Sequence, residues 1–306
     1  MRIIFTGAGQ IGVPTLQALK KSPEHELLAV VTQPDKPVGR AQCIEAPPIK
    51  KALAGTGPPI LQPARIKDPQ AIEEIHTLQP DVIIVMAYGQ IFPREVLEIP
   101  QIACVNLHAS LLPRWRGAAP IQAAIAAGDQ KTGITVMYMD EGLDTGDILL
   151  QRKIDILPTD TGVSLHDRLA EIAPEALLES LRMLANGNAP RIPQDDSFAT
   201  HAPKLKREHG KIDWSEPAEV IERKIRAFNP WPGAFMKIDG QNLKIFSASV
   251  VDLSGKPGEI LCSEKNLFIA AGKDALSLRE VQLEGKRRMR VREFLRGHAR
   301  SLRAAR

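Results

Sequence analysis

The sequence predicts an α/β protein in which a Rossmann-like, mostly parallel sheet precedes a small β-barrel of the oligonucleotide-binding (OB) type. Short apolar runs alternate with helical stretches over the first 150 residues. These runs are apolar almost throughout, as expected for strands buried on both faces. A polar, proline-bearing stretch is followed by short, closely spaced strands, which favours a barrel. We therefore expect a Rossmann-like domain over 1–188, a linker over 189–206 and a barrel domain over 207–306.

The expected elements follow from hydrophobic periodicity and from turn residues. In the first region, apolar runs predict strands at 2–6, 27–32, 81–87, 102–107 and 134–139, with helices near 12–21, 47–54, 69–78, 93–98 and 118–127. An added edge strand at 147–156 and a long amphipathic helix at 161–187 complete it. After the linker, a helix at 218–228 precedes strands at 234–238, 243–251, 258–263, 267–271 and 276–283.

The composition is that of an ordinary globular protein. Of 306 residues, 43% are hydrophobic and 25% are charged, and no apolar run reaches the roughly 18 residues that a membrane span needs. The N-terminal residues lack the apolar core of a signal peptide. Cys43, Cys104 and Cys262 are isolated and odd in number, which argues against a disulfide framework or a cysteine zinc site. We expect a cytoplasmic protein without a membrane segment.

The positive charge is concentrated near the C-terminus. The net charge is +4 overall, and counting along the chain assigns +7 to residues 207–306 and −3 to the remainder. The last 21 residues hold nine Lys and Arg side chains, with Glu293 as their one acidic residue. Such a run is a candidate contact for a polyanion, although a solvated, partly frayed tail would have the same composition.

The turn "GAGQIG" at residues 7–12 follows a predicted strand and fits the glycine spacing of a dinucleotide-binding fingerprint. An acidic residue, Asp35, lies at about the expected distance. It follows Pro34 inside a loop, however, whereas the ribose-binding carboxylate should lie at the strand tip. A tight turn that packs a helix close to its strand would carry the same glycines, so these residues leave both interpretations open.

A second candidate site lies at the end of a buried strand, in the sequence "CVNLHASLLPRWRGAAPIQ". Asn106 and His108 are two residues apart, so they point to the same face of the strand. An amide and an imidazole that converge can both donate hydrogen bonds to a developing oxyanion. The loop "MDEGLDTGDIL" adds three carboxylates, any of which could orient the histidine and favour its charged form; they are Asp140, Asp144 and Asp147.

Each of these residues also has an ordinary structural interpretation. A single histidine at a strand end is often a satisfied structural residue, and an aspartate beside glycine often forms a turn. A zinc site is disfavoured because asparagine is a poor zinc ligand and no second histidine lies at ligand spacing. We therefore expect no metal.

Together, "NLHASLLPRWRGAAPIQ" and "GLDTGDIL" resemble the signature of folate-dependent formyltransferases. The resemblance covers about residues 2–285, and "VTQPDKPVGR", "MAYGQIF", "HAPKL", "IDWS" and "IRAFNPWPG" extend it toward the methionyl-tRNA formyltransferases. The glycine turn departs from the Gly-Thr-Pro turn that is usual in that family. The resemblance disfavours NAD as a cofactor.

The resemblance implies transfer of a formyl group from 10-formyltetrahydrofolate to the α-amino group of methionine on initiator tRNA. It assigns catalysis to Asn106, His108 and Asp144. Main-chain groups near Tyr88, Gly89, Ile91 and Phe92 would line the pterin pocket, with Ser110, Leu111, Leu112 and Pro113 against the folate. Leu111 and Leu112 also suit core packing.

Contacts with tRNA are implied at Arg40, Lys204, Lys286, Arg287 and Arg288. Here "AQCI" replaces the lysines that usually follow Arg40 in the family, so we expect weaker binding by that loop. The expected enzyme is a monomer whose partner is initiator methionyl-tRNA. The alternatives are a sugar-nucleotide amine or glycinamide ribonucleotide as acceptor, a folate hydrolase or dehydrogenase-linked module, an NAD-dependent oxidoreductase, and a tRNA-binding module with an inactive site.

Overall fold

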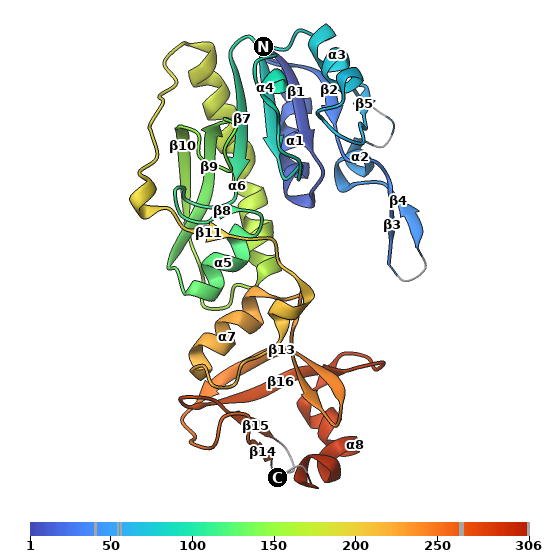
Figure 1. The fold of residues 1–306 in the computed structure, drawn as a ribbon, viewed down its shortest axis with the longest axis vertical. Helices are drawn as coiled ribbons and strands as arrows, with labels where there is room; N and C mark the ends of the chain where they lie inside the picture. The colour runs from blue at the N-terminus through green and yellow to red at the C-terminus, as the bar shows by residue number, and fades with distance from the viewer. Residues whose placement is uncertain (40–41, 54, 56, 263–265, 305–306) are drawn as a thin grey trace. The chain divides into compact units, whose positions relative to one another are not determined.

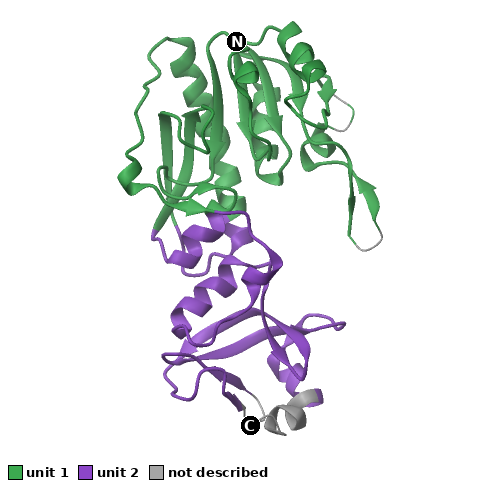
Figure 2. Ribbon diagram, viewed as in Figure 1, with its two compact units in different colours: residues 1–120, 131–155, 166–202 green, residues 121–130, 156–165, 203–306 purple. Residues whose placement is uncertain are grey.

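The computed structural model describes residues 1–39, 42–53, 55, 57–262 and 266–304. Two compact units divide the chain, as Figure 2 shows: residues 1–120, 131–155 and 166–202 form the first, and residues 121–130, 156–165 and 203–306 form the second. The boundaries at residues 188 and 206 stay a prediction, because two earlier segments also join the second unit. Among the described residues, no helix combines the length and apolar character needed to cross a membrane.

A seven-stranded sheet forms the centre of the first unit, in the order β10-β9-β7-β6-β1-β2-β5 (Figure 1). Five neighbouring strands, from β7 to β5, run parallel, and β9 and β10 are antiparallel additions at one side. This confirms the predicted mostly parallel sheet. The strands are β1 (Arg2–Gly7), β2 (Glu26–Val31), β5 (Ile60–Leu61), β6 (Val82–Met86), β7 (Ala103–His108), β9 (Lys131–Tyr138) and β10 (Ile148–Asp155).

The central strands are apolar runs because helices and loops cover both faces of the sheet. All five residues of β6 are buried, as are residues 3–7 of β1. The helices lie close to the predicted ranges: α1 (Val13–Lys21), α2 (Pro48–Leu53), α3 (Pro69–Thr77), α4 (Arg94–Leu97), α5 (Pro120–Ala127) and α6 (Gly162–Ala185).

Strand β5 at the edge of the main sheet was not predicted, and two further small features of the first unit also have no counterpart in the predicted elements. A hairpin of β3 (Lys36–Val38) and β4 (Cys43–Glu45) extends from the loop after β2. A short parallel pair joins β8 (Arg116–Gly117) to β11 (His201–Ala202). The second pair brings the predicted linker region against the segment that follows β7.

The second unit contains a curled antiparallel sheet, in the order β12-β13-β16-β15-β14 with β17 beside β16. The amphipathic helix α7 contributes Ile221 and Ile225 to its core. The sequence thus correctly predicted a small antiparallel domain here. Its elements are α7 (Ala218–Ala227), β12 (Ala234–Ile238), β13 (Gln241–Val251), β14 (Ile260–Cys262), β15 (Leu267–Ala270), β16 (Ala275–Leu283), β17 (Met289–Arg290) and α8 (Val291–Ala304).

Most of the basic C-terminal run forms helix α8 in the structure. In α8, Val291, Phe294 and Leu295 are buried in the core of the second unit. Their spacing of three and four residues is that of one helical face. Three apolar side chains therefore hold the start of this helix against the second unit, and the contact with a polyanion stays a prediction.

Candidate active site

Strand β7 places Asn106 and His108 on one face of the sheet, while Leu107 between them is buried against the other. The strand lies between β6 and β9, with Asn106 paired to Val85 and to Met137. Neighbours on both sides satisfy its backbone and hold its register. The two polar side chains therefore project from a rigid position rather than from a mobile loop, which suits a site that depends on geometry.

The His108 ring is 5% exposed, and both of its nitrogens face polar atoms. Nε2 lies 2.8 Å from the main-chain oxygen of Trp115. Because a carbonyl oxygen can only accept, Nε2 carries a proton in this arrangement. Nδ1 is then the nitrogen that gains or loses a proton, and it lies 3.6 Å from the Asp144 carboxylate. The main chain thus fixes the tautomer of the neutral ring.

Asp144 is the member of the acidic loop that reaches these side chains. Its Oδ2 accepts a hydrogen bond from the Gly117 amide at 2.7 Å and is the oxygen nearest to His108. Its Oδ1 lies 3.5 Å from the Asn106 amide nitrogen. The structure therefore brings together the amide, the imidazole and the carboxylate that the sequence singled out.

The other two candidate carboxylates have different tasks. Asp140 accepts hydrogen bonds from the Gly142 amide and from the Thr145 hydroxyl, so it closes its own loop. Asp147 lies 3.9 Å from the Arg191 guanidinium. Residue type and loop position did not separate the three, because all stand in one glycine-containing loop, whereas the family resemblance selected Asp144.

The loop that carries Asp144 has to fold back to reach the site. Strand β9 runs antiparallel to β7, so its last residue, Tyr138, pairs with Val105 rather than with the end of β7. The returning chain packs so closely that a Cβ on Gly146 would lie 1.9 Å from the Tyr138 carbonyl oxygen. Gly146 is therefore required by this close approach, and Asp144 itself has a left-handed φ of 56°.

The segment over 189–202 belongs to the site rather than to a free linker. Thr200 accepts a hydrogen bond from the Trp115 amide through its hydroxyl and another from the Arg116 amide through its carbonyl. Gln194 donates to the main chain of the Asp144 loop and accepts from the Arg116 guanidinium. Periodicity gave no signal for Gln194 or Arg116, because such contacts depend on chain segments far apart in sequence.

The residues expected to contact the folate fall into an exposed and a buried group. Gly89 is exposed with φ 82°, and Ile91 is 75% exposed. The Tyr88 and Phe92 rings are buried and pack edge to face, with centroids 6.0 Å apart. The Tyr88 hydroxyl is buried, and it has no hydrogen-bond partner among the described residues. Burial raises the pKa of Tyr88 to about 12.

The segment after β7 is similarly packed inward. The Ser110 hydroxyl is buried and donates to the Arg114 carbonyl at 2.6 Å. Leu112 is buried, whereas Leu111 and Pro113 are half-buried. Ser110 and Leu112 therefore support the shape of the site and offer no polar group to a ligand.

The glycine turn at residues 7–12 uses its amides within the protein. The amides of Ala8 and Gly9 both donate to the Ala87 carbonyl, at 3.2 and 3.3 Å. A Cβ on Gly7 would lie 2.7 Å from the Met86 carbonyl oxygen. These contacts explain the glycines through close packing of β1 against the end of β6.

The expected tRNA contacts that the structure describes all lie in the second unit. Arg40 lies outside the described residues. Lys204 is exposed in the second unit, as is Lys286. Arg287 pairs with Glu293, and Arg288 pairs with Glu280 while its guanidinium lies 4.4 Å from the centroid of the Phe246 ring.

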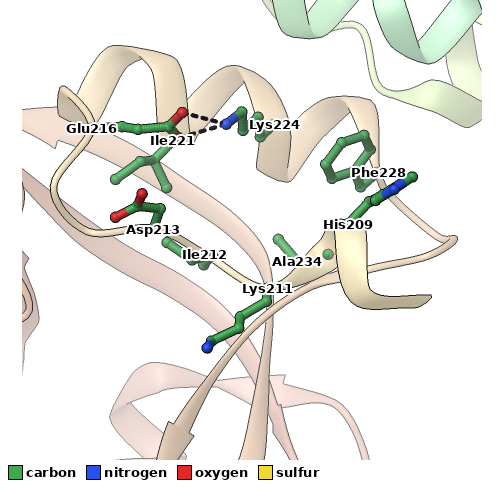
Figure 3. Close-up of a pocket in the computed structure, with 10 residues that line it drawn as sticks. His209, Lys211, Ile212, Asp213, Glu216, Ile221, Lys224, Phe228 and Ala234 are labelled. Carbon is green, nitrogen blue, oxygen red and sulfur yellow. Dashed lines mark hydrogen bonds and ion pairs between the residues drawn. The ribbon is translucent and has the colours of Figure 1, made fainter. Parts of the chain in front are cut away.

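A separate pocket lies within the second unit, shown in Figure 3. An ion pair between Lys224 and Glu216, 2.6 Å long, lines one side, and His209 and Phe228 line another. No residue that the sequence assigned to catalysis, folate or tRNA lines this pocket. Within the described residues, no cluster of three His, Cys, Asp or Glu side chains is arranged to hold a metal ion.

Two protein-family models match the chain. Residues 1–181 match the formyl transferase model, and residues 204–299 match the model of the formyl transferase C-terminal domain. The chain belongs to the formyl transferase family. A methionyl-tRNA formyltransferase of Geobacter sulfurreducens is 44% identical to this family member over 298 residues, which cover 97% of this chain and 94% of the relative.

Other relatives agree with this assignment. A methionyl-tRNA formyltransferase of Pseudomonas fluorescens is 47% identical over 286 residues, covering 93% of this chain and 90% of the relative. Among solved structures, the methionyl-tRNA formyltransferase of Clostridium thermocellum superposes with a TM-score of 0.60 at 22% identity, covering 92% of this chain and 98% of that one. The sugar 3N-formyl transferase WlaRD gives 0.68 at 18% identity, covering 94% and 99%. These two structures share the formyl transferase fold.

Proposed function

We propose that this formyl transferase moves the formyl group of 10-formyltetrahydrofolate to the α-amino group of methionyl-initiator tRNA, which yields formylmethionyl-tRNA for translation initiation. The observation that carries the proposal is the convergence of Asn106, His108 and Asp144 at one end of β7. The acceptor follows from the identity of 44 to 47% that the chain shares, over nearly its full length, with methionyl-tRNA formyltransferases.

Asn106 and His108 serve as hydrogen-bond donors to the oxygen that gains negative charge when the amine attacks the formyl carbon. Both side chains stand on a strand, so they need no rearrangement as the charge develops. Because Nε2 is held by the Trp115 carbonyl, His108 donates to this oxygen through Nδ1 when it is charged; the 3.6 Å between Nδ1 and Asp144 is too long for a hydrogen bond, so this N–H is available. The Asn106 amide donates from the same face of β7.

Asp144 pairs with His108 and accepts the proton that the attacking amine loses. Its carboxylate lies 3.6 Å from His108 Nδ1 and can pair with the ring when that nitrogen carries a proton. The carboxylate can also accept, through a water molecule, the proton that leaves the attacking amine. The Gly117 amide keeps this carboxylate in place. These steps use no metal ion and no covalent bond to the enzyme.

The folate fits the exposed main chain that follows β6. Ala87 and Gly89 have left-handed φ angles of 51° and 82°, and both are exposed. A pterin ring carries hydrogen-bond donors and acceptors along its edge, which main-chain groups of this kind can match. The buried rings of Tyr88 and Phe92 support this main-chain segment. Leu111 and Pro113 contact the folate in this proposal. Bound 10-formyltetrahydrofolate supplies the formyl group.

The proposed binding of tRNA depends on positively charged side chains. We propose that Lys204, Lys286, Arg287 and Arg288 contact phosphates, and that Arg40 reads the end of the acceptor stem. The net charge of +7 over residues 207–306 supports this proposal. Phosphate contacts make binding strongly dependent on salt.

We also propose that the enzyme is a cytoplasmic monomer. Its isolated cysteines suit a reducing compartment. Sedimentation equilibrium tests whether the enzyme is a monomer, because a dimer would double the measured mass. Cell fractionation with an antibody against the chain tests whether it is cytoplasmic.

The reaction itself is tested with purified protein, 10-formyltetrahydrofolate and charged tRNA. Methionyl-initiator tRNA should be formylated, and uncharged tRNA or a dTDP-linked amino sugar should not be. Formylation of the amino sugar without that of tRNA would reverse the choice of acceptor. Failure with every amine tested would contradict the proposed function.

A further inference from the structure

Gln194 ties the loop of the catalytic carboxylate to the rest of the first unit. Its amide nitrogen donates to the main-chain oxygens of Asp144, at 2.9 Å, and of Gly146, at 2.8 Å. Both N–H groups of the amide are therefore used. One side chain spans the turn from residue 144 to 146, although it comes from a polar segment some fifty residues farther along the chain.

Arg116 sets the direction in which this amide points. Its side chain is buried, and its Nε and Nη2 donate to Gln194 Oε1 at 3.0 and 2.8 Å. A guanidinium has only donors, so the amide oxygen has to face Arg116 and the nitrogen has to face the loop. The same Nη2 also donates to Asp196, which secures the guanidinium.

The residue that is held in this way is conformationally unusual. Asp144 has φ 56°, a left-handed value that is unfavourable for a non-glycine residue. Gln194 binds its carbonyl oxygen, and the Gly117 amide binds its carboxylate. Arg116 and Gly117 are neighbours, so one short strand fixes Asp144 from both its main chain and its side chain.

We propose that Gln194 is a positioning residue, oriented by Arg116, which keeps the Asp144 carboxylate aimed at His108 Nδ1. The inference rests on the proposed formyl transfer. It predicts that Gln194 affects the rate of the chemical step through Asp144 without contacting a substrate.

The first test compares wild type, Gln194→Ala and the neighbouring variant Asp195→Ala. The Asp195 carboxylate accepts hydrogen bonds from the amide and hydroxyl of Ser197, within its own turn. Gln194→Ala should lower kcat about 10- to 100-fold, because small misplacements of a catalytic group have effects of this size. The KM values for tRNA and for folate should stay within about twofold, since uniform binding is not affected. A change in KM at constant kcat would overturn the proposal.

The second test asks whether the effect passes through the carboxylate. In an Asp144→Asn background, Gln194→Ala should lower kcat by less than about twofold further, because residues that act as a unit are not additive. If the two effects multiply in full, Gln194 acts elsewhere and the proposal fails. Thermal unfolding of each variant separates loss of folded protein from loss of rate.

The third test needs no activity. Hydrogen exchange should accelerate in the peptide that covers residues 140–147 of Gln194→Ala, and Asp195→Ala should exchange like wild type. Unchanged exchange in Gln194→Ala would overturn the positioning role whatever the reaction is. If wild type fails to formylate methionyl-tRNA, the proposed function fails, and the exchange experiment still decides whether Gln194 holds the loop.

Discussion

Asp144 and Arg288 are both charged side chains that we assign to one reaction, yet the protein holds them in opposite ways. The Asp144 side chain is 12% exposed; the Gly117 amide donates to its carboxylate, and the Gln194 side chain donates to its main-chain carbonyl. Arg288 is 49% exposed and contacts one glutamate and one aromatic ring. The contacts of Asp144 fix the orientation of its carboxylate, whereas Arg288 adds positive charge to an exposed surface.

This difference has measurable consequences. A buried group surrounded by fixed dipoles acts in a medium of low polarity, where each interaction is strong. An exposed charge is screened by salt, and its individual contribution is small. Substitutions at the end of β7 should therefore change kcat, and substitutions on the basic surface should change binding and its dependence on salt.

Replacing the carboxylate should have the largest effect. Asp144→Asn keeps the size of the side chain but removes its charge and its ability to take a proton. We expect kcat to fall roughly 100- to 10,000-fold, the range for loss of a general acid–base group. Asp147→Asn, in the same loop but near Arg191, is the control and should retain most activity. Similar losses in both variants would contradict a special role for Asp144.

Loss of the amide donor should come next. Asn106→Ala removes one hydrogen bond to the developing oxyanion, which typically costs about 100- to 1000-fold in kcat. Asn188→Ala changes an exposed asparagine and serves as the matched control. Steady-state kinetics with both substrates measures the effect. A variant that differs from wild type only in KM would exclude the amide from transition-state stabilisation.

A single cation on the basic surface should matter much less. Lys286→Ala should weaken tRNA binding about eightfold at 0.1 M salt, and should reduce the slope of log Kd against log salt by about 0.9, as expected when one phosphate contact is lost. Lys286→Arg keeps the charge and should bind like wild type. Filter binding between 50 and 200 mM NaCl measures both quantities. An unchanged slope in Lys286→Ala would remove this residue from the interface.

The smallest effect is expected at Tyr88. Its buried hydroxyl has no hydrogen-bond partner in the part of the chain that the structure describes. Tyr88→Phe should therefore raise the free energy of unfolding by about 1 kcal/mol. The KM for folate should stay unchanged, because only the main chain of Tyr88 is proposed to line the site. A raised KM would instead assign the hydroxyl to the ligand.

The same variant makes a prediction for alkaline pH. Burial raises the pKa of Tyr88 to about 12 in the folded protein, whereas an unfolded tyrosine ionises near pH 10. Between these values the unfolded state loses the proton first, so wild type loses stability as the pH rises. The advantage of Tyr88→Phe should grow from pH 10 to 12. Urea unfolding at several pH values would show it.

Local patterns predicted the framework well. The period of two placed Asn106 and His108 on one face, and the structure has them there because both neighbours of β7 hold its register. Hydrophobic runs also located the longer strands and the helices of the first unit to within a few residues, but not the short strands, such as β5. The helix from residue 291 was missed, although Val291, Phe294 and Leu295 form an apolar face, because the density of basic residues suggested a solvated tail.

Sequence by itself determined the residue types that can carry the chemistry and the strand that presents two of them, since alternation along a strand is a local property. Residue types and spacing left Asp140, Asp144 and Asp147 open; the family resemblance selected Asp144, and the tertiary structure places its carboxylate 3.6 Å from His108. It also brought Gln194 to the same loop from a segment without periodicity. These choices depend on hydrogen bonds and close packing between distant parts of the chain, which no local pattern records.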